Sequence, residues 1–88
     1  MSSVPKKQTS FAIPKKLYRI GDIMRYTGLS RQTLHNYTVL GLIREEERTA
    51  GGHRLYPESV FERLRRIHEL RRENTLREIR EMLERESQ

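Results

Sequence analysis

The sequence predicts a mainly α-helical domain of the winged helix-turn-helix class, with a small β-hairpin as the wing and two further helices. Two observations carry this prediction. Apolar residues recur at helical spacing on both sides of a glycine-containing turn near residue 28, which is the pattern of two short helices joined tightly. Farther along, a Gly-Gly pair separates two short runs of extended type, which is the pattern of a hairpin.

The first predicted helix begins near Tyr18. Ile20, Ile23 and Met24 follow at spacing i, i+3 and i+4, so they share one apolar face. Gly28 comes next, and its tolerance of positive φ suits the end of a helix and a change of chain direction. We therefore expect a short amphipathic helix that ends at this glycine.

The second predicted helix runs over residues 31–40. Ser30 precedes it and is expected to be its N-cap, because a serine hydroxyl can accept from the free amides of the next turn. Leu34, Tyr37 and Leu40 are expected to point inward from this helix. Three residues with one glycine separate it from the first helix, which is typical of a helix-turn-helix.

The next segment is predicted to be the hairpin. Its first extended run begins at Ile43, Thr49–Gly52 form the tip, and residues 53–56 return. Both glycines of the tip tolerate positive φ. Pro57 then suits the first turn of a third helix, where its missing amide costs nothing.

The third helix is expected to end near Asn74, a residue type that accepts a left-handed conformation after a helix. Thr75 and Glu78 have the spacing of a capping box and start a fourth helix. Its inward residues are expected to be Leu76, Ile79, Met82 and Leu83.

The net charge of +6 is concentrated at the N-terminal end. Residues 1–19 carry +5 and no acid, residues 20–42 carry +1, and the arginines and glutamates of residues 43–88 cancel. We divide the chain into a flexible basic arm over residues 1–17 and a folded domain over residues 18–86. Such an uneven distribution favours a polyanion that meets the arm and a limited surface, although a solubilising tail is the alternative.

Other functional classes find little support. The chain has no cysteine, its three histidines lack metal-ligand spacing, Asp22 is its one aspartate, and no glycine-rich phosphate loop is present. We therefore expect no enzyme activity, no cofactor and no metal. No apolar run approaches the roughly 20 residues that span a bilayer, and we expect a cytoplasmic, nucleoid-associated protein without a membrane partner.

Several segments, in the right order, resemble the DNA-binding domain of the MerR family. They are residues 18–23 (YRIGDI), residues 27–34 (TGLSRQTL), residues 48–56 (RTAGGHRLY) and residues 75–79 (TLREI), within a similarity that covers residues 18–84. The resemblance implies that the second helix enters the major groove of double-stranded DNA while the wing grips the flanking backbone. It also implies a transcriptional regulator that binds a specific sequence.

The residues themselves agree with this function. Arg31 and Gln32 lie on the first turn of the second helix, the end that reaches base edges, where arginine reads guanine and glutamine reads adenine. The free amides there also favour a phosphate. Thr33 either contacts DNA or supports the turn before the second helix. The predicted DNA-binding residues are Lys15, Lys16, Arg19, Ser30, Arg31, Gln32, Thr33, His35, Asn36, Tyr37, Arg48 and Arg54.

Five of these residues carry more specific expectations. Tyr37 matches a family tyrosine near the DNA backbone, and we expect its ring to be half in the core with its hydroxyl free to reach a phosphate. His35 and Asn36 depart from the arginine and tyrosine usual in the family, which weakens the grip on the backbone or makes it pH-dependent. In the wing, Arg54 matches a phosphate-contacting arginine and Arg48 is expected across the hairpin from it.

The acidic stretch Glu45–Glu47 does not fit a DNA-binding wing, and we expect it to face solvent or a basic partner. A second copy of the chain is one candidate. Because the sequence ends soon after the fourth helix, we expect no small-molecule effector and a monomer in free solution that self-associates on DNA. Two alternatives stay open: an excisionase-like architectural factor that bends DNA, and a protein-interaction module that has lost DNA binding.

Overall fold

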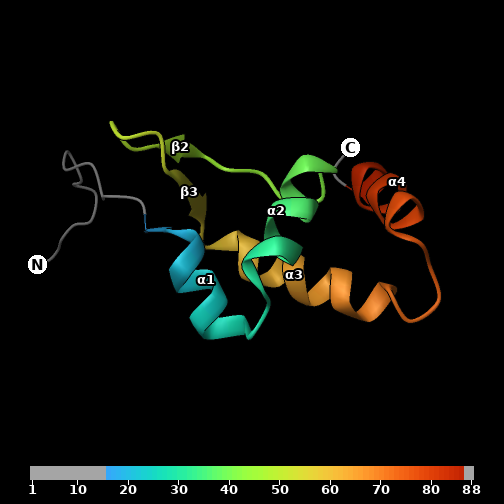
Figure 1. Ribbon diagram of the computed structural model, residues 1–88. Coiled ribbons are helices and arrows are strands. Elements are labelled where there is room, and N and C mark those ends of the chain that lie inside the picture. Colours follow the sequence, from blue (N-terminus) through green and yellow to red (C-terminus); the bar gives the residue numbers. More distant parts are fainter. Residues whose placement is uncertain (1–15, 87–88) are drawn as a thin grey trace, which may run out of the picture.

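The computed structural model describes residues 16–86, so the predicted basic arm lies outside the described residues up to residue 15. The elements follow in the order β1 (Leu17–Tyr18), α1 (Ile20–Thr27), α2 (Arg31–Val39), β2 (Glu47–Arg48), β3 (Arg54–Pro57), α3 (Ser59–Leu70) and α4 (Leu76–Glu86). The strands form one antiparallel sheet in the order β1-β3-β2. The hairpin of β2 and β3 projects at one end of the molecule and α4 lies at the other (Figure 1). The predicted fold class is confirmed.

The turn between α1 and α2 is built as the sequence predicts. Gly28 has φ +78°, and its amide donates to the carbonyl of Met24 at 2.9 Å. The Ser30 hydroxyl accepts from the amide of Thr33 at 3.1 Å and so caps α2. These two local devices, a left-handed glycine and a serine cap, end one helix and begin the next within three residues.

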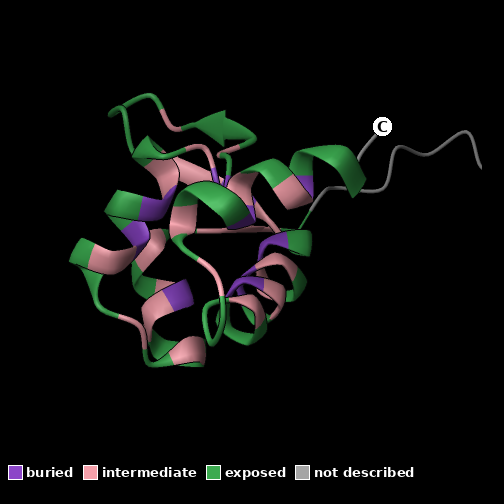
Figure 2. Cartoon of the chain, turned by 90° about the vertical axis from the view of Figure 1, so that its right-hand side faces the viewer, coloured by how far each residue is buried: buried purple, intermediate pink, exposed green. Residues whose placement is uncertain are grey.

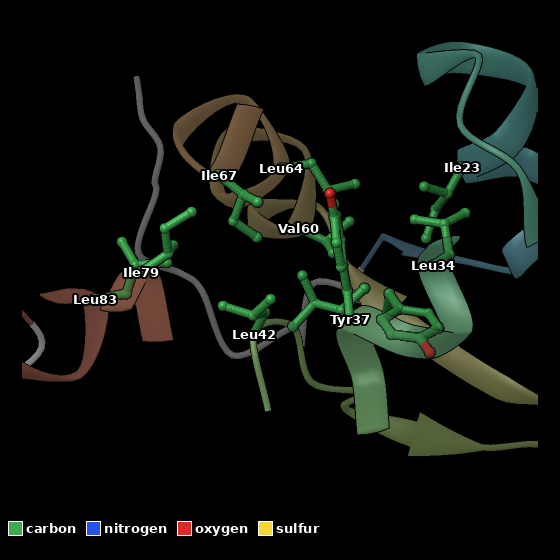
Figure 3. Close-up of a cluster of buried hydrophobic side chains, with 11 residues drawn as sticks. Ile23, Leu34, Tyr37, Leu42, Val60, Leu64, Ile67, Ile79 and Leu83 are labelled. Carbon is green, nitrogen blue, oxygen red and sulfur yellow. The ribbon is translucent and has the colours of Figure 1, made fainter. Parts of the chain in front are cut away.

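A single apolar core joins all four helices to the sheet. Residues coloured as buried lie on the sides of the helices that face one another, while the outer sides are coloured as exposed (Figure 2). Side chains of α1, α2, α3 and α4 converge in Figure 3. The buried residues are Ile23, Leu34, Tyr37, Leu42, Ile43, Tyr56, Val60, Leu64, Ile67, Ile79 and Leu83. Burial of this apolar surface is the main force that holds α2 and the wing in fixed relation.

One predicted core position is wrong. Leu40 is 44% exposed rather than inward, because α2 ends at Val39 and Gly41, with φ +80°, turns the chain back beneath the helix. Leu42 then fills the core at 0% exposure, and its amide donates to the carbonyl of Tyr37 at 2.8 Å. The helical period stops at Val39, so a pattern extended one residue farther, to the C-cap position, selects the wrong leucine.

The boundaries of the wing and of α3 also differ from the predictions. The first strand begins at Glu47 rather than at Ile43, which is buried in the core, and only Gly52 of the glycine pair has positive φ, at +88°. Pro57 ends β3, paired with Leu17, rather than starting α3. Leu17, which was assigned to the arm, therefore belongs to β1 with Tyr18, and the first helix begins at Ile20 rather than near Tyr18.

Helix α3 ends at Leu70, four residues before Asn74. No residue other than glycine has positive φ in the described part of the chain. Instead, the Asn74 side-chain amide donates to the Leu70 carbonyl at 3.0 Å and satisfies the helix end without a left-handed turn.

The last helix begins with the predicted capping box. The amide of Thr75 donates to the Glu78 carboxylate at 2.8 Å, and the amide of Glu78 donates to the Thr75 hydroxyl at 3.1 Å. Arg66 of α3 pairs with Glu86 near the end of α4. Local capping therefore starts α4, and buried apolar residues with this ion pair hold it against α3.

Candidate nucleic-acid interface

The outer face of α2 carries exposed polar side chains. Arg31, Gln32, His35 and Asn36 are all exposed, and their spacing places them on neighbouring rows of the helix. The Gln32 amide donates to the Asn36 side-chain oxygen at 3.0 Å, so these two residues orient each other. The face therefore offers a cation and two amides, with no acid in the first turn of the helix.

Two other predicted site residues of α2 have structural tasks. Ser30 caps the helix, and its hydroxyl also donates to the Thr33 hydroxyl at 2.9 Å. Both residues remain at the surface of the first turn, since Ser30 is exposed and Thr33 is half-buried. The structure thus brings them beside Arg31 and Gln32 but engages their hydroxyls with each other.

Tyr37 differs from the expectation. Its side chain is buried at 5% exposure rather than half in the core, and its hydroxyl accepts from Arg71 at 3.2 Å rather than being free. Arg71 directly follows α3 and lies 34 positions after Tyr37 in the chain. No sequence pattern around Tyr37 could therefore predict this hydrogen bond. Packing of α3 against α2 therefore gives this tyrosine a role in the fold.

A basic hollow lies between α1, α2 and the wing. It measures about 390 Å³ and is lined by Arg19, Ile20, Gly21, Arg31, Gly52, His53 and Arg54. All three of these arginines were predicted separately as site residues, and the fold brings them to one place. Among residues 16–86, no carboxylate lines the hollow. A concave surface with several cations and no acid suits an anion such as a phosphate.

His53 and Gly21 are lining residues that the sequence prediction missed. His53 follows the glycine pair of the wing tip, next to Arg54, and this position is the one sequence signal that could have drawn attention to it. A Cβ built on Gly21 meets no atom within 4 Å. The protein itself therefore does not require glycine there.

The two wing arginines face each other, as predicted, and share one carboxylate. Arg48 pairs with Arg54 in the register of β2 and β3. Glu45 accepts from Arg54 Nε at 2.7 Å and is in an ion pair with Arg48. The hydrogen bond from Arg48 is the main cause that lowers the pKa of Glu45, and Glu45 in turn raises the pKa of Arg48. Of the acidic stretch, Glu45 thus faces the wing arginines, while Glu46 and Glu47 are exposed.

The remaining predicted residues lie at the edges. Lys16 is exposed directly before β1, and Lys15 is outside the described residues. Arg19 precedes α1, and its amide donates to the Asp22 carboxylate at 3.1 Å. That hydrogen bond, followed by one from Arg25, lowers the pKa of Asp22.

Two further observations concern the described residues alone. Within residues 16–86, no helix is both long and apolar enough to cross a membrane. In the same part of the chain, no three histidine, aspartate or glutamate side chains gather as ligands for a metal ion.

Comparisons with known proteins agree with this architecture. The family model described as MerR HTH family regulatory protein matches residues 18–86. The nodulation protein NolA of Bradyrhizobium elkanii is 39% identical over 71 residues, which cover 80% of this chain and 32% of NolA. The HTH-type transcriptional regulator ZntR of Escherichia coli K12 is 37% identical over 68 residues, 76% of this chain and 48% of ZntR.

A solved structure is similar as well. The N-terminal part of MtaN, the multidrug transporter activator of Bacillus subtilis, superposes with a TM-score of 0.71 at 34% identity, covering 75% of this chain and 63% of that one. The chain spans about a third of NolA and about half of ZntR. Since the family model covers most of the chain, the protein belongs to the MerR family of helix-turn-helix regulatory proteins.

Proposed function

We propose that this chain binds double-stranded DNA as the recognition domain of a transcriptional regulator. In this proposal α2 enters the major groove, and the wing and the start of α1 hold the flanking backbone. The observation that carries it is the basic hollow, where Arg19, Arg31 and Arg54 come together from three elements beside the exposed face of α2. Such a protein acts where the chromosome is, at the nucleoid.

The residues divide into two roles. Arg31 and Gln32, on the first turn of α2, would read base edges, with Asn36 holding the Gln32 amide in place. Phosphate contacts would come from Lys15, Lys16, Arg19, His35, Arg48 and Arg54, which read charge rather than sequence. Ser30 and Thr33 would support the start of α2, where free amides favour a phosphate.

The direct test is binding to duplex DNA by fluorescence anisotropy across a series of salt concentrations. Affinity should fall with a log–log slope of about −0.9 for each phosphate neutralised. A flat response would contradict DNA binding. Removal of residues 1–16 should weaken binding to all sequences about equally, because a lysine arm reads charge alone.

Affinities for selected and for random duplexes distinguish residues that recognise the base sequence from residues that bind DNA of any sequence. Gln32→Ala and Arg31→Ala should lose discrimination at particular base pairs, by about 1–3 kcal/mol for each bidentate contact. Arg54→Ala should weaken binding to selected and random DNA alike. Equal losses for all three variants on every duplex would mean that α2 does not read bases.

For assembly we propose a monomer in free solution that gains affinity from neighbouring copies on DNA. Some charged side chains are less available for a contact between copies, because they already form ion pairs within the chain. Glu45 pairs within the wing, and Arg65 pairs with Glu62 and Glu69 within α3. Sedimentation without DNA should give the monomer mass, and tandem sites should fill cooperatively. A stable dimer without DNA would overturn this proposal.

A further inference from the structure

The wing places two like charges opposite each other. Arg48 and Arg54 are direct partners in the register of β2 and β3, and like charges in such a pair repel. Glu45, just before β2, relieves this repulsion. Its Oε1 accepts from Arg54 Nε at 2.7 Å and from Arg48 Nη2 at 3.4 Å, and its Oε2 accepts from Arg48 Nε. One carboxylate therefore serves both guanidinium groups.

One of these two guanidinium groups, that of Arg54, also faces the proposed ligand. Arg54 lines the basic hollow with Arg19 and Arg31, so one side chain belongs both to the hollow and to the Glu45 pair. A phosphate at Arg54 would lie within a few ångströms of the Glu45 carboxylate, and two anions at that distance repel each other. The Glu45 side chain is 26% exposed, and the ion pair is open to solvent. Exchange of one anion for another is therefore sterically simple.

Resting on the proposed function, we infer that Glu45 is an internal competitor of DNA phosphates for the two wing arginines. In the free protein Glu45 neutralises part of the wing. On DNA a backbone phosphate takes its place, and the carboxylate turns to solvent. The wing therefore favours specific over non-specific DNA. DNA that α2 does not position adds little binding energy at the wing, because Glu45 already occupies the two arginines. When α2 is bound in the major groove of a specific site, a backbone phosphate lies at the wing arginines and displaces Glu45.

The test compares two isosteric variants that remove one negative charge from the same wing. Glu45→Gln breaks the arginine pairing. Glu47→Gln is the matched control, because Glu47 is exposed and is in no ion pair within residues 16–86. Anisotropy is measured on a random-sequence duplex that is too short for two copies. Glu45→Gln should tighten binding about five- to tenfold and steepen the salt slope by about one ion, against about twofold or less for Glu47→Gln.

A second measurement identifies the arginines as the cause. In the Arg48→Ala/Arg54→Ala background, the gain from Glu45→Gln should fall to that from Glu47→Gln, because the residues no longer interact. Thermal melts of every variant check that the wing variants fold.

The outcomes separate the two proposals. If the wild type binds duplex DNA but Glu45→Gln equals Glu47→Gln, or binds more weakly, Glu45 does not compete and this inference alone is overturned. If the wild type shows no salt-dependent binding, the proposed function fails and this inference fails with it.

Discussion

Two arginines on the face formed by α1, α2 and the wing differ in their pairing from the arginines of α3. In α3, Arg63 donates to the Leu42 carbonyl at 2.7 Å, Arg65 pairs with two glutamates of its own helix, and Arg66 pairs with Glu86. In contrast, Arg19 and Arg31 are in no ion pair within residues 16–86, and both line the basic hollow. Arginines thus make ion pairs at one end of the molecule, whereas two arginines at the other end carry a charge that no ion pair within residues 16–86 balances.

The comparison teaches that net charge alone does not locate a binding surface. Helices α3 and α4 are rich in arginine, yet their charges are balanced by glutamates at helical spacing. Surface ion pairs of this kind contribute little to stability, but they remove charge from the field that a polyanion meets. Unbalanced arginines that gather from separate elements are the better indicator of an anion site.

The sharpest test of the comparison removes two charges from each region. Arg19→Ala/Arg31→Ala should weaken binding to random duplex DNA on the order of tenfold and reduce the salt slope by about 0.9, because the Arg19 phosphate contact is lost, and should also lose discrimination between selected and random DNA through Arg31. Arg65→Ala/Arg66→Ala lowers the net charge by the same amount and should leave all three quantities nearly unchanged. Equal losses for the two double variants would show that overall charge, and not the hollow, attracts DNA.

Gly21→Ala tests whether the hollow itself is occupied. Alanine meets no protein atom there, and within a helix it is favoured over glycine by about 0.5–1 kcal/mol, so thermal stability should hold or rise. The added methyl group projects from a residue that lines the hollow, and DNA affinity should fall about three- to tenfold. Unchanged affinity, measured by anisotropy with a melt in parallel, would mean that the backbone of α1 does not approach the DNA.

Tyr37→Phe separates a role in the fold from contact with DNA. The variant removes the hydroxyl that accepts from Arg71, which should lower the free energy of unfolding by about 1 kcal/mol. DNA affinity should stay within about twofold, since the hydroxyl is already engaged inside the domain. Urea denaturation measures the first quantity. A large loss of DNA affinity with an unchanged free energy of unfolding would mean that the Tyr37 hydroxyl contacts DNA.

The smallest expected effect is a pH dependence at the start of α1. Hydrogen bonds from the Arg19 amide and then from Arg25 lower the pKa of Asp22 below its ordinary value of 3.8. The stabilisation is therefore present above about pH 4 and is lost as the pH falls through the lower pKa of the folded state. Asp22→Asn should melt slightly below wild type at pH 7 and converge with it near pH 2. A constant difference at all pH values would mean that the carboxylate charge contributes nothing.

The local devices of the fold and their order along the chain follow from the amino-acid sequence. The Gly28 turn, the Ser30 cap, the Gly52 tip and the Thr75–Glu78 capping box all depend on residues at most four positions apart, and all were predicted. Short-range geometry is encoded in neighbouring residue types, so pattern and propensity are sufficient to find it. The family resemblance then supplied the arrangement of these devices and the class of ligand.

Contacts between side chains that are distant in the sequence depend on the packed domain. Leu42 rather than Leu40 enters the core, the Tyr37 hydroxyl finds Arg71, and three arginines from separate elements line one hollow with His53. The pairing of Glu45 with Arg54, nine positions away, also required the closed hairpin. Such contacts depend on how buried faces pack and on the register of paired strands, and both are settled by burial across the whole domain rather than by neighbours in the chain.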